Sequence, residues 1–234
     1  MRRLSETDLA RNAVLDDDEQ LLRSLRRLKG FRASHSLEFV RNRQADLFGV
    51  QPPMFQVPRA PDEQLLDLIA RECRTDEDRA YCLPLARAML AYRDENAAEA
   101  VEWSVSRWQV GYGQSVCYWP GYYFVLKEHA EFSYFDLRLN DSLTAEGRRF
   151  VLSLMHERLR RGEPDFEDAK LSILKAKRVG VDERSFVRYG AEEVSLMDRD
   201  ELNSRIDRAY RFWQFVLEER AEEARKATGT GPLL

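Results

Sequence analysis

The spacing of apolar residues along the chain changes from a helical period to alternation and then back again. Where apolar residues recur every three or four positions, the pattern predicts amphipathic helices. These stretches are residues 16–29, 36–48, 62–74, 75–92, 95–109, 144–161, 165–177 and 198–226. Where the period falls to two, the pattern predicts strands. These stretches are residues 114–119, 122–128 and 131–139, with a further short strand at 185–189.

Two short turns join the three central strands into a predicted antiparallel meander at about residues 114–139. Pro120–Gly121 forms the first turn and His129–Ala130 the second. With two-residue turns, Trp119 lies opposite Tyr122, and Cys117 lies opposite Phe124. One face of the meander is then almost wholly apolar, and we expect flanking helices to cover it. The sequence therefore predicts a mostly helical α+β fold built on a three-stranded sheet.

Four prolines between residues 51 and 61 interrupt the helical pattern, because proline cannot continue a helix. This segment predicts a boundary. The expected organisation is an N-terminal helical pair at 1–49, a proline-rich linker at 50–61, a main α+β domain at 62–226 and a disordered tail at 227–234.

Composition excludes several classes of protein. The 234 residues carry 37 basic and 41 acidic side chains, a net charge of −4, so no global field attracts nucleic acid or anionic lipid. No apolar run is long enough to span a membrane, and the N-terminus lacks the apolar region of a signal peptide. The three cysteines and three histidines are not spaced as metal ligands, and no cofactor motif is present. Arginine far outnumbers lysine, which indicates a GC-rich bacterial genome. We expect a bacterial cytoplasmic protein.

Positive charge is concentrated in one stretch near the N-terminus. Residues 22–43 contain seven basic residues and a single acidic one, Glu38. The basic residues are Arg23, Arg26, Arg27, Lys29, Arg32, Arg41 and Arg43. Two helices joined by a short turn could dock this charge on the phosphates of DNA or RNA. A solvated helical face, or a partner for an acidic surface, is the alternative explanation.

A second candidate is the other face of the meander, where aromatic rings gather. Tyr118, Tyr123 and Tyr134 would form a platform on which single-stranded bases could stack. The alternative is that another helix covers these tyrosines and that their hydroxyl groups form hydrogen bonds at its rim.

A third candidate is a pair of residues on the helix predicted at 144–161. Arg149 and His156 lie seven positions apart, which places them on one helical face. Their spacing resembles the Arg-x4-6-His motif of HEPN-type ribonucleases. The resemblance covers this motif only, and it implies that the pair stabilises phosphate and transfers protons at a dimer interface.

The leading hypothesis from the sequence is a non-enzymatic protein that binds nucleic acid, or a nucleic-acid-associated partner, through the basic helical hairpin. One alternative is a nuclease or toxin-like enzyme that uses Arg149 and His156. The other is a protein-interaction or adaptor module without nucleic-acid contact. Neither the oligomeric state nor the partner follows from the sequence.

Overall fold

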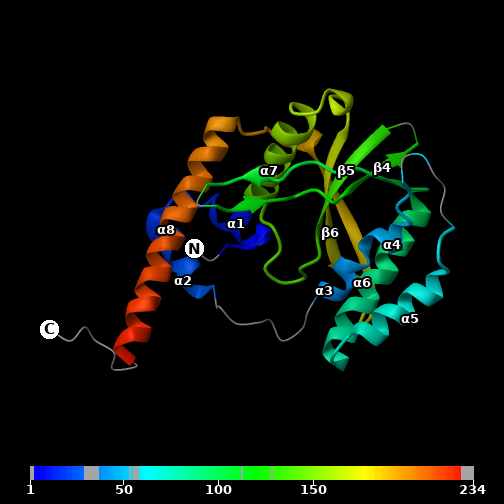
Figure 1. Ribbon diagram of the computed structural model, residues 1–234, viewed down its shortest axis with the longest axis horizontal. Coiled ribbons are helices and arrows are strands. Elements are labelled where there is room, and N and C mark those ends of the chain that lie inside the picture. The colour runs from blue at the N-terminus through cyan, green and yellow to red at the C-terminus, as the bar shows by residue number, and fades with distance from the viewer. Residues whose placement is uncertain are drawn as a thin grey trace.

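The fold, seen in a computed structural model, is α+β with more helix than strand, as the sequence predicts (Figure 1). The structure describes residues 3–28, 37–52, 54, 58–111, 113–127 and 129–227. The α-helices are α1 (Glu6–Asn12), α2 (Asp18–Arg27), α3 (Glu38–Asn42), α4 (Gln44–Phe48), α5 (Asp62–Glu72), α6 (Asp76–Glu95), α7 (Ala145–Met155) and α8 (Arg199–Ala227). The strands are β1 (Glu99–Glu102), β2 (Trp108–Gln109), β3 (Ser115–Val116), β4 (Tyr122–Leu126), β5 (His129–Asp136), β6 (Lys170–Arg178) and β7 (Arg184–Gly190).

The predicted three-stranded meander is wrong. The main sheet has five strands in the order β1-β4-β5-β6-β7, and β2 and β3 form a separate two-stranded sheet. Of the three predicted strands, only the second and third pair with each other, as β4 and β5, and Phe124 lies opposite Glu131 rather than opposite Cys117. Because β3 lies in the two-stranded sheet, no hairpin joins it to β4 through Pro120–Gly121. A trans Pro-Gly pair favours a type II turn, whose twist suits a two-residue hairpin poorly.

Two predicted helices are strands in the structure. Residues 170–178 form β6, which pairs in parallel with β5 and antiparallel with β7. The side chains from Leu171 to Leu174 are all buried, because helices cover both faces of this central strand. A strand buried on both sides shows no alternation, so its apolar run imitates a helix.

The other misassigned strand is β1. The structure ends α6 at Glu95, and Ala97 follows in the left-handed region with φ 44°. This conformation reverses the chain after the helix. The next residues then pair with β4 as an edge strand, from Glu99 opposite Val125 to Glu102 opposite Tyr122.

Several helical predictions are confirmed. Asp17 caps α2, and its side chain accepts from the backbone N–H of Gln20 at 2.6 Å. Thr75 caps α6 in the same way, and Pro84 lies inside that helix. The helix predicted at 36–48 is broken at Arg43 into α3 and α4. The short helix α1 was not predicted.

The sheet separates two hydrophobic cores. Alternate residues of each strand point to opposite faces, so Phe132 of β5 enters one core while Phe135 enters the other. The first core is covered by α1 and α2 from the N-terminal end of the chain, α7 from its middle and α8 from its C-terminal end (Figure 1). The second core is covered by α3, α4, α5 and α6. Trp119, Tyr122 and Phe124 are buried, as expected.

The proposed domain boundary at 50–61 stays a prediction. Gln51, at the start of this segment, is fixed to β1: its N–H donates to Ala100 at 2.8 Å, and its carbonyl accepts from Glu102 at 2.8 Å. The predicted disordered tail lies outside the described residues, apart from Ala227 at the end of α8. In the described part of the chain, no helix is both long and apolar enough to cross a membrane.

Candidate functional site

The basic residues predicted to bind phosphates do not share one surface. The helix α2 packs against α8, whereas α3 and α4 pack against α5 and α6 (Figure 1). Arg26 of α2 pairs with Glu219 of α8, with Nε–Oε2 at 3.0 Å and Nη2–Oε1 at 2.6 Å. Arg43 pairs with Glu72 and Asp46. Both guanidinium groups are therefore neutralised by intramolecular partners.

The remaining members of the basic stretch differ in their surroundings. Arg23 and Arg27 are exposed on α2, and Arg41 is exposed on α3. No ion pair joins any of these three to another described residue. Lys29 and Arg32 lie outside the described residues, as does the turn expected between the two helices.

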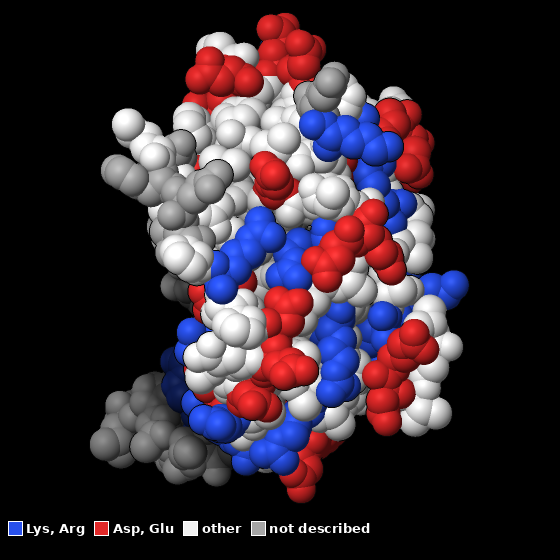
Figure 2. Space-filling model, turned by 90° about the vertical axis from the view of Figure 1, so that its right-hand side faces the viewer, with Lys and Arg blue, Asp and Glu red and all other residues white. Residues whose placement is uncertain are grey.

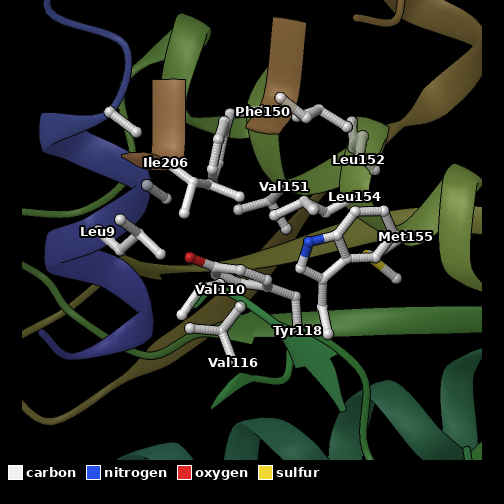
Figure 3. Packing of buried hydrophobic residues seen from close by; sticks show 14 of the residues in the cluster. Leu9, Val110, Val116, Tyr118, Phe150, Val151, Leu152, Leu154, Met155 and Ile206 are labelled. Carbon is white, nitrogen blue, oxygen red and sulfur yellow. The ribbon is translucent and has the colours of Figure 1, made fainter. Parts of the chain in front are cut away.

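The tyrosine platform is a covered face rather than an exposed one. Tyr118 and Tyr134 do come together, with ring centroids 5.3 Å apart, but Tyr118 is fully buried. Its hydroxyl donates to the Glu6 carbonyl at 2.7 Å, so α1 lies directly over it. Figure 3 shows Tyr118 enclosed by side chains that include Leu9 and Phe150. No base can stack on this ring while the helices remain in place.

The other two tyrosines are also held by neighbours. Tyr123 is half-buried and packs edge-on against Phe166, with ring centroids 5.1 Å apart. The Tyr134 hydroxyl lies 3.0 Å from Thr7 Oγ1, and burial raises the pKa of Tyr134 to about 12. These contacts match the alternative in which a helix covers the tyrosines.

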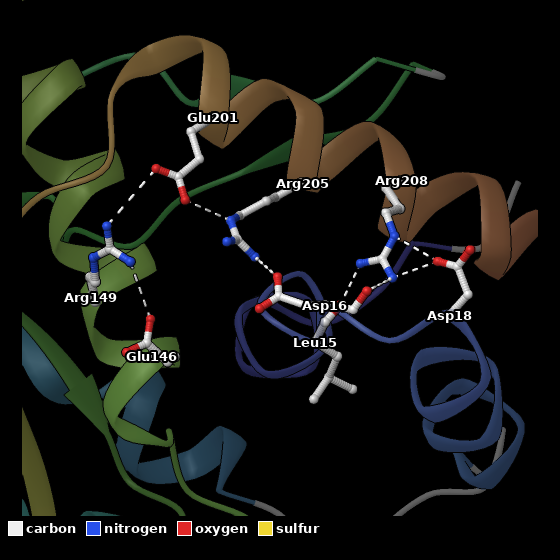
Figure 4. Close-up of polar contacts among 8 residues, drawn as sticks. All are labelled: Leu15, Asp16, Asp18, Glu146, Arg149, Glu201, Arg205 and Arg208. Carbon is white, nitrogen blue, oxygen red and sulfur yellow. Dashed lines mark hydrogen bonds and ion pairs between the residues drawn. The ribbon is translucent and has the colours of Figure 1, made fainter.

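Arg149 of the predicted catalytic pair is already engaged by α8 and its approach (Figure 4). Its Nε donates to the Ser195 carbonyl at 2.6 Å, and its Nη atoms lie 3.3 Å from Glu146 and 3.9 Å from Glu201. Two carboxylates beside a guanidinium compete with any phosphate for it. The ribonuclease activity implied by the spacing stays a prediction, without support from these contacts.

His156 begins a π-helical segment, His156–Arg160, that continues α7. Its Nδ1 is buried without a hydrogen-bond partner. Burial, with a smaller contribution from the Arg160 guanidinium, lowers the pKa of His156 below its ordinary value. The described residues contain no cluster of His, Cys, Asp or Glu that could hold a metal ion.

A hollow of about 250 Å³ lies where α1, α3, α4 and β5 meet, and we call it the β5 hollow. Its lining includes Thr7, Arg41, Gln44, Trp119, Tyr134 and Arg138. The Nε2 atom of Gln44 is buried and has no hydrogen-bond partner. Two of the predicted site residues, Arg41 and Tyr134, therefore line one hollow. The sequence placed them in two separate candidate sites.

A second hollow of about 350 Å³ lies between α4 and α5, and we call it the α4–α5 groove. Its lining is more apolar than polar and includes Ala45, Gly49, Val50, Pro58, Leu65 and Leu68. Figure 2 shows the side of the molecule on which α4 and α5 lie, and acidic and basic side chains are interspersed there. The short helix α4 thus borders both hollows.

The comparisons with known proteins identify the family. Residues 7–223 match the family described as the sliding clamp-binding bacterial toxin SocB. The chain belongs to this family. It is 28% identical over 229 residues to the DNA replication inhibitor toxin SocB of Caulobacter vibrioides, and the match covers 98% of this chain and 95% of that protein. No solved structure matches the chain.

The leading hypothesis of a nucleic-acid-binding protein is therefore wrong. The family is described as toxins that bind a protein, the sliding clamp, which agrees better with the protein-interaction alternative. Local positive charge misled the interpretation, because Arg26 and Arg43 serve as intramolecular ion-pair partners in this fold. The expectation of a bacterial protein is confirmed.

Sequence reasoning missed Gln44 as a residue of a candidate site, and it placed Arg138 only at the edge of the tyrosine face. Arg138 follows β5 and bridges to α1, with Nη1 2.8 Å from Asp8 and Nη2 3.1 Å from Ser5 Oγ. Gln44 starts a helix of only five residues. The sequence carries one signal for this site, a break in the helical spacing of apolar residues near Arg43. Distant elements bring the Gln44 amide to the hollow, and such contacts leave no periodic pattern in the sequence.

Proposed function

We propose that this chain is a toxin that binds the bacterial sliding clamp and thereby inhibits DNA replication in the cytoplasm. The observation that carries the proposal is the family match over residues 7–223, because it extends across nearly the whole fold. The named relative covers the same length. A protein that blocks a partner by binding needs an interaction surface rather than catalytic groups.

The α4–α5 groove is the surface that we propose for the clamp. Apolar residues line its floor, and its surroundings carry charges of both signs (Figure 2). An apolar centre with a polar rim is the usual composition of a protein interface. Ala45 and Asp46 of α4 are exposed at its edge, where a partner can reach them.

The test is surface plasmon resonance between the full chain and the sliding clamp of the bacterium that encodes it. We expect saturable binding, and we expect Ala45→Arg to raise the Kd at least about tenfold, because an arginine side chain would fill the groove. Ala221→Arg on α8 is the matched control. Ala221 is also exposed on a helix, and arginine is nearly as good a helix former as alanine.

The outcomes separate the function from the site. Clamp binding that Ala45→Arg leaves unchanged would refute the groove while keeping the function. Absence of any binding by the unaltered chain, together with normal DNA synthesis after its induction in cells, would refute the function itself.

A further inference from the structure

The β5 hollow exposes part of a strand edge. The pairing of β4 with β5 ends at Phe124 opposite Glu131, while β5 continues to pair with β6 as far as Asp136. No described strand pairs with β5 beyond Glu131 on the β4 side. Backbone polar groups along this edge can therefore bond to a ligand in the hollow.

Side-chain donors converge on the same place from separate elements. Gln44 Nε2 has no partner, and the Arg41 guanidinium forms no ion pair with a described residue. The Tyr134 hydroxyl, which shares a hydrogen bond with Thr7, adds a third polar group. A buried amide without a partner is costly, and a ligand oxygen would remove that cost.

The charges around the hollow specify the ligand's charge. Glu6 lines the hollow and pairs with Arg3, and Arg138 pairs with Asp8 at 2.8 Å. The charges within each pair cancel. Arg41 forms no ion pair with a described residue, so it leaves a net charge of about +1 at the hollow. One positive charge matches a monoanion, whereas a dianionic phosphate would leave excess negative charge beside Glu6 and Asp8.

We propose that the β5 hollow binds a carboxylate carried on a small apolar body. The planar guanidinium of Arg41 matches a carboxylate with two parallel hydrogen bonds, and the Gln44 amide donates to a carboxylate oxygen. Trp119, Pro120 and Leu137 line the hollow and pack against the apolar body. A volume of about 250 Å³ is smaller than a typical drug-sized site, so the ligand is a small acid or one terminal residue of a peptide.

This site is independent of the clamp and requires no clamp for its test. Isothermal titration calorimetry on the full chain uses benzoate as the probe, with benzamide as its neutral isostere. We expect benzoate to bind with a Kd on the order of 1 mM, as for a fragment of this size, and benzamide to bind at least about tenfold more weakly.

Variants tie the binding to the hollow. Arg41→Gln should weaken benzoate binding at least about tenfold, because it removes the charge-assisted pair. Arg23→Gln, an equally exposed arginine on α2, should leave benzoate binding unchanged. Equal affinities for benzoate and benzamide, or an Arg41→Gln variant that binds benzoate as before, would overturn the proposal.

The source of the carboxylate is tested with acetyl-Gly-Phe and its C-terminal amide. Tighter binding of the peptide acid than of benzoate, lost in the amide, assigns the site to a peptide C-terminus lying along the β5 edge. Binding of benzoate without the peptide acid assigns it to a free small acid. No heat from either acid would overturn the site, whatever the chain does with the clamp.

Discussion

The two faces of the main sheet are stabilised in different ways. The face under α1, α2, α7 and α8 is packed almost wholly with apolar and aromatic side chains, with Tyr118 and Phe150 at its centre (Figure 3). The face under α3 to α6 has an aromatic cluster around Phe48, but it also carries a buried carboxylate, Glu131. The first face gains most of its stability from burying apolar area, and its buried carboxyl group, Asp136, accepts a hydrogen bond from the Leu143 N–H at 2.7 Å. The second face satisfies its buried carboxylate with an ion pair.

The Glu131 carboxylate is satisfied by residues of two neighbouring strands. Arg188 of β7 donates to it, with Nη2–Oε2 at 3.0 Å, and Ser172 of β6 donates at 2.6 Å. Ser133 lies 2.9 Å from Ser172 and completes the network. A one-residue slip between these strands would leave a buried charge unpaired, so the network fixes the register of β5, β6 and β7.

Ion pairs join the N-terminal helices to α8 at the two ends of the chain (Figure 4). Arg205 of α8 reaches Asp16 at 2.9 Å and Glu201 at 3.0 Å, and Arg208 Nε donates to Asp18 at 2.8 Å. Asp16 and Asp18 are exposed, so the pairs that they form contribute little alone. Apolar burial, rather than these pairs, holds the ends together.

The largest effect should come from the apolar face. Tyr118→Ala removes a fully buried ring and should lower the free energy of unfolding by about 3–5 kcal/mol. Chemical denaturation measures the loss. Tyr118→Phe, which removes only the hydroxyl bonded to the Glu6 carbonyl, should cost about 1 kcal/mol. A loss for Tyr118→Ala below that of Tyr118→Phe would contradict a packed first face.

A smaller effect should follow from the charged face. Arg188→Ala leaves Glu131 buried without its cation and should lower the free energy of unfolding by about 2–4 kcal/mol. This loss is at the lower end of the range for buried ion pairs because Arg188 is partly exposed. The double variant Arg188→Met with Glu131→Leu should recover most of the loss, as measured by thermal unfolding. A double variant as unstable as the single one would show that the charge pair is not the cause.

The smallest effect concerns His156, whose buried Nδ1 has no hydrogen-bond partner. Its folded pKa lies below the ordinary value of 6.5, so the neutral form is favoured by folding. Stability from this group is complete above about pH 6.5 and is lost as the pH falls through the folded pKa. We expect His156→Leu to remove this part of the acid sensitivity. If the free energies of unfolding of the unaltered protein and of His156→Leu change in parallel between about pH 7 and pH 5, His156 does not contribute to the acid sensitivity.

The sequence by itself determined the helices whose apolar stripes face one core. The helix α2, the helix after the proline segment and the long C-terminal helix all follow from local periodicity. The α+β class also followed, because a period of two in the middle of the chain can only be strand.

Tertiary structure decided the rest. Residues 170–178 become β6 because both faces of the sheet are covered, and burial on two sides removes the alternation that marks a strand. The β5 hollow joins Thr7, Gln44 and Arg138, which come from three segments far apart in the chain. Arg26 forms an ion pair with Glu219 of α8, and Arg43 forms one with Glu72 of α5. Contacts between distant segments leave no local pattern, so these features could be seen only in the folded chain.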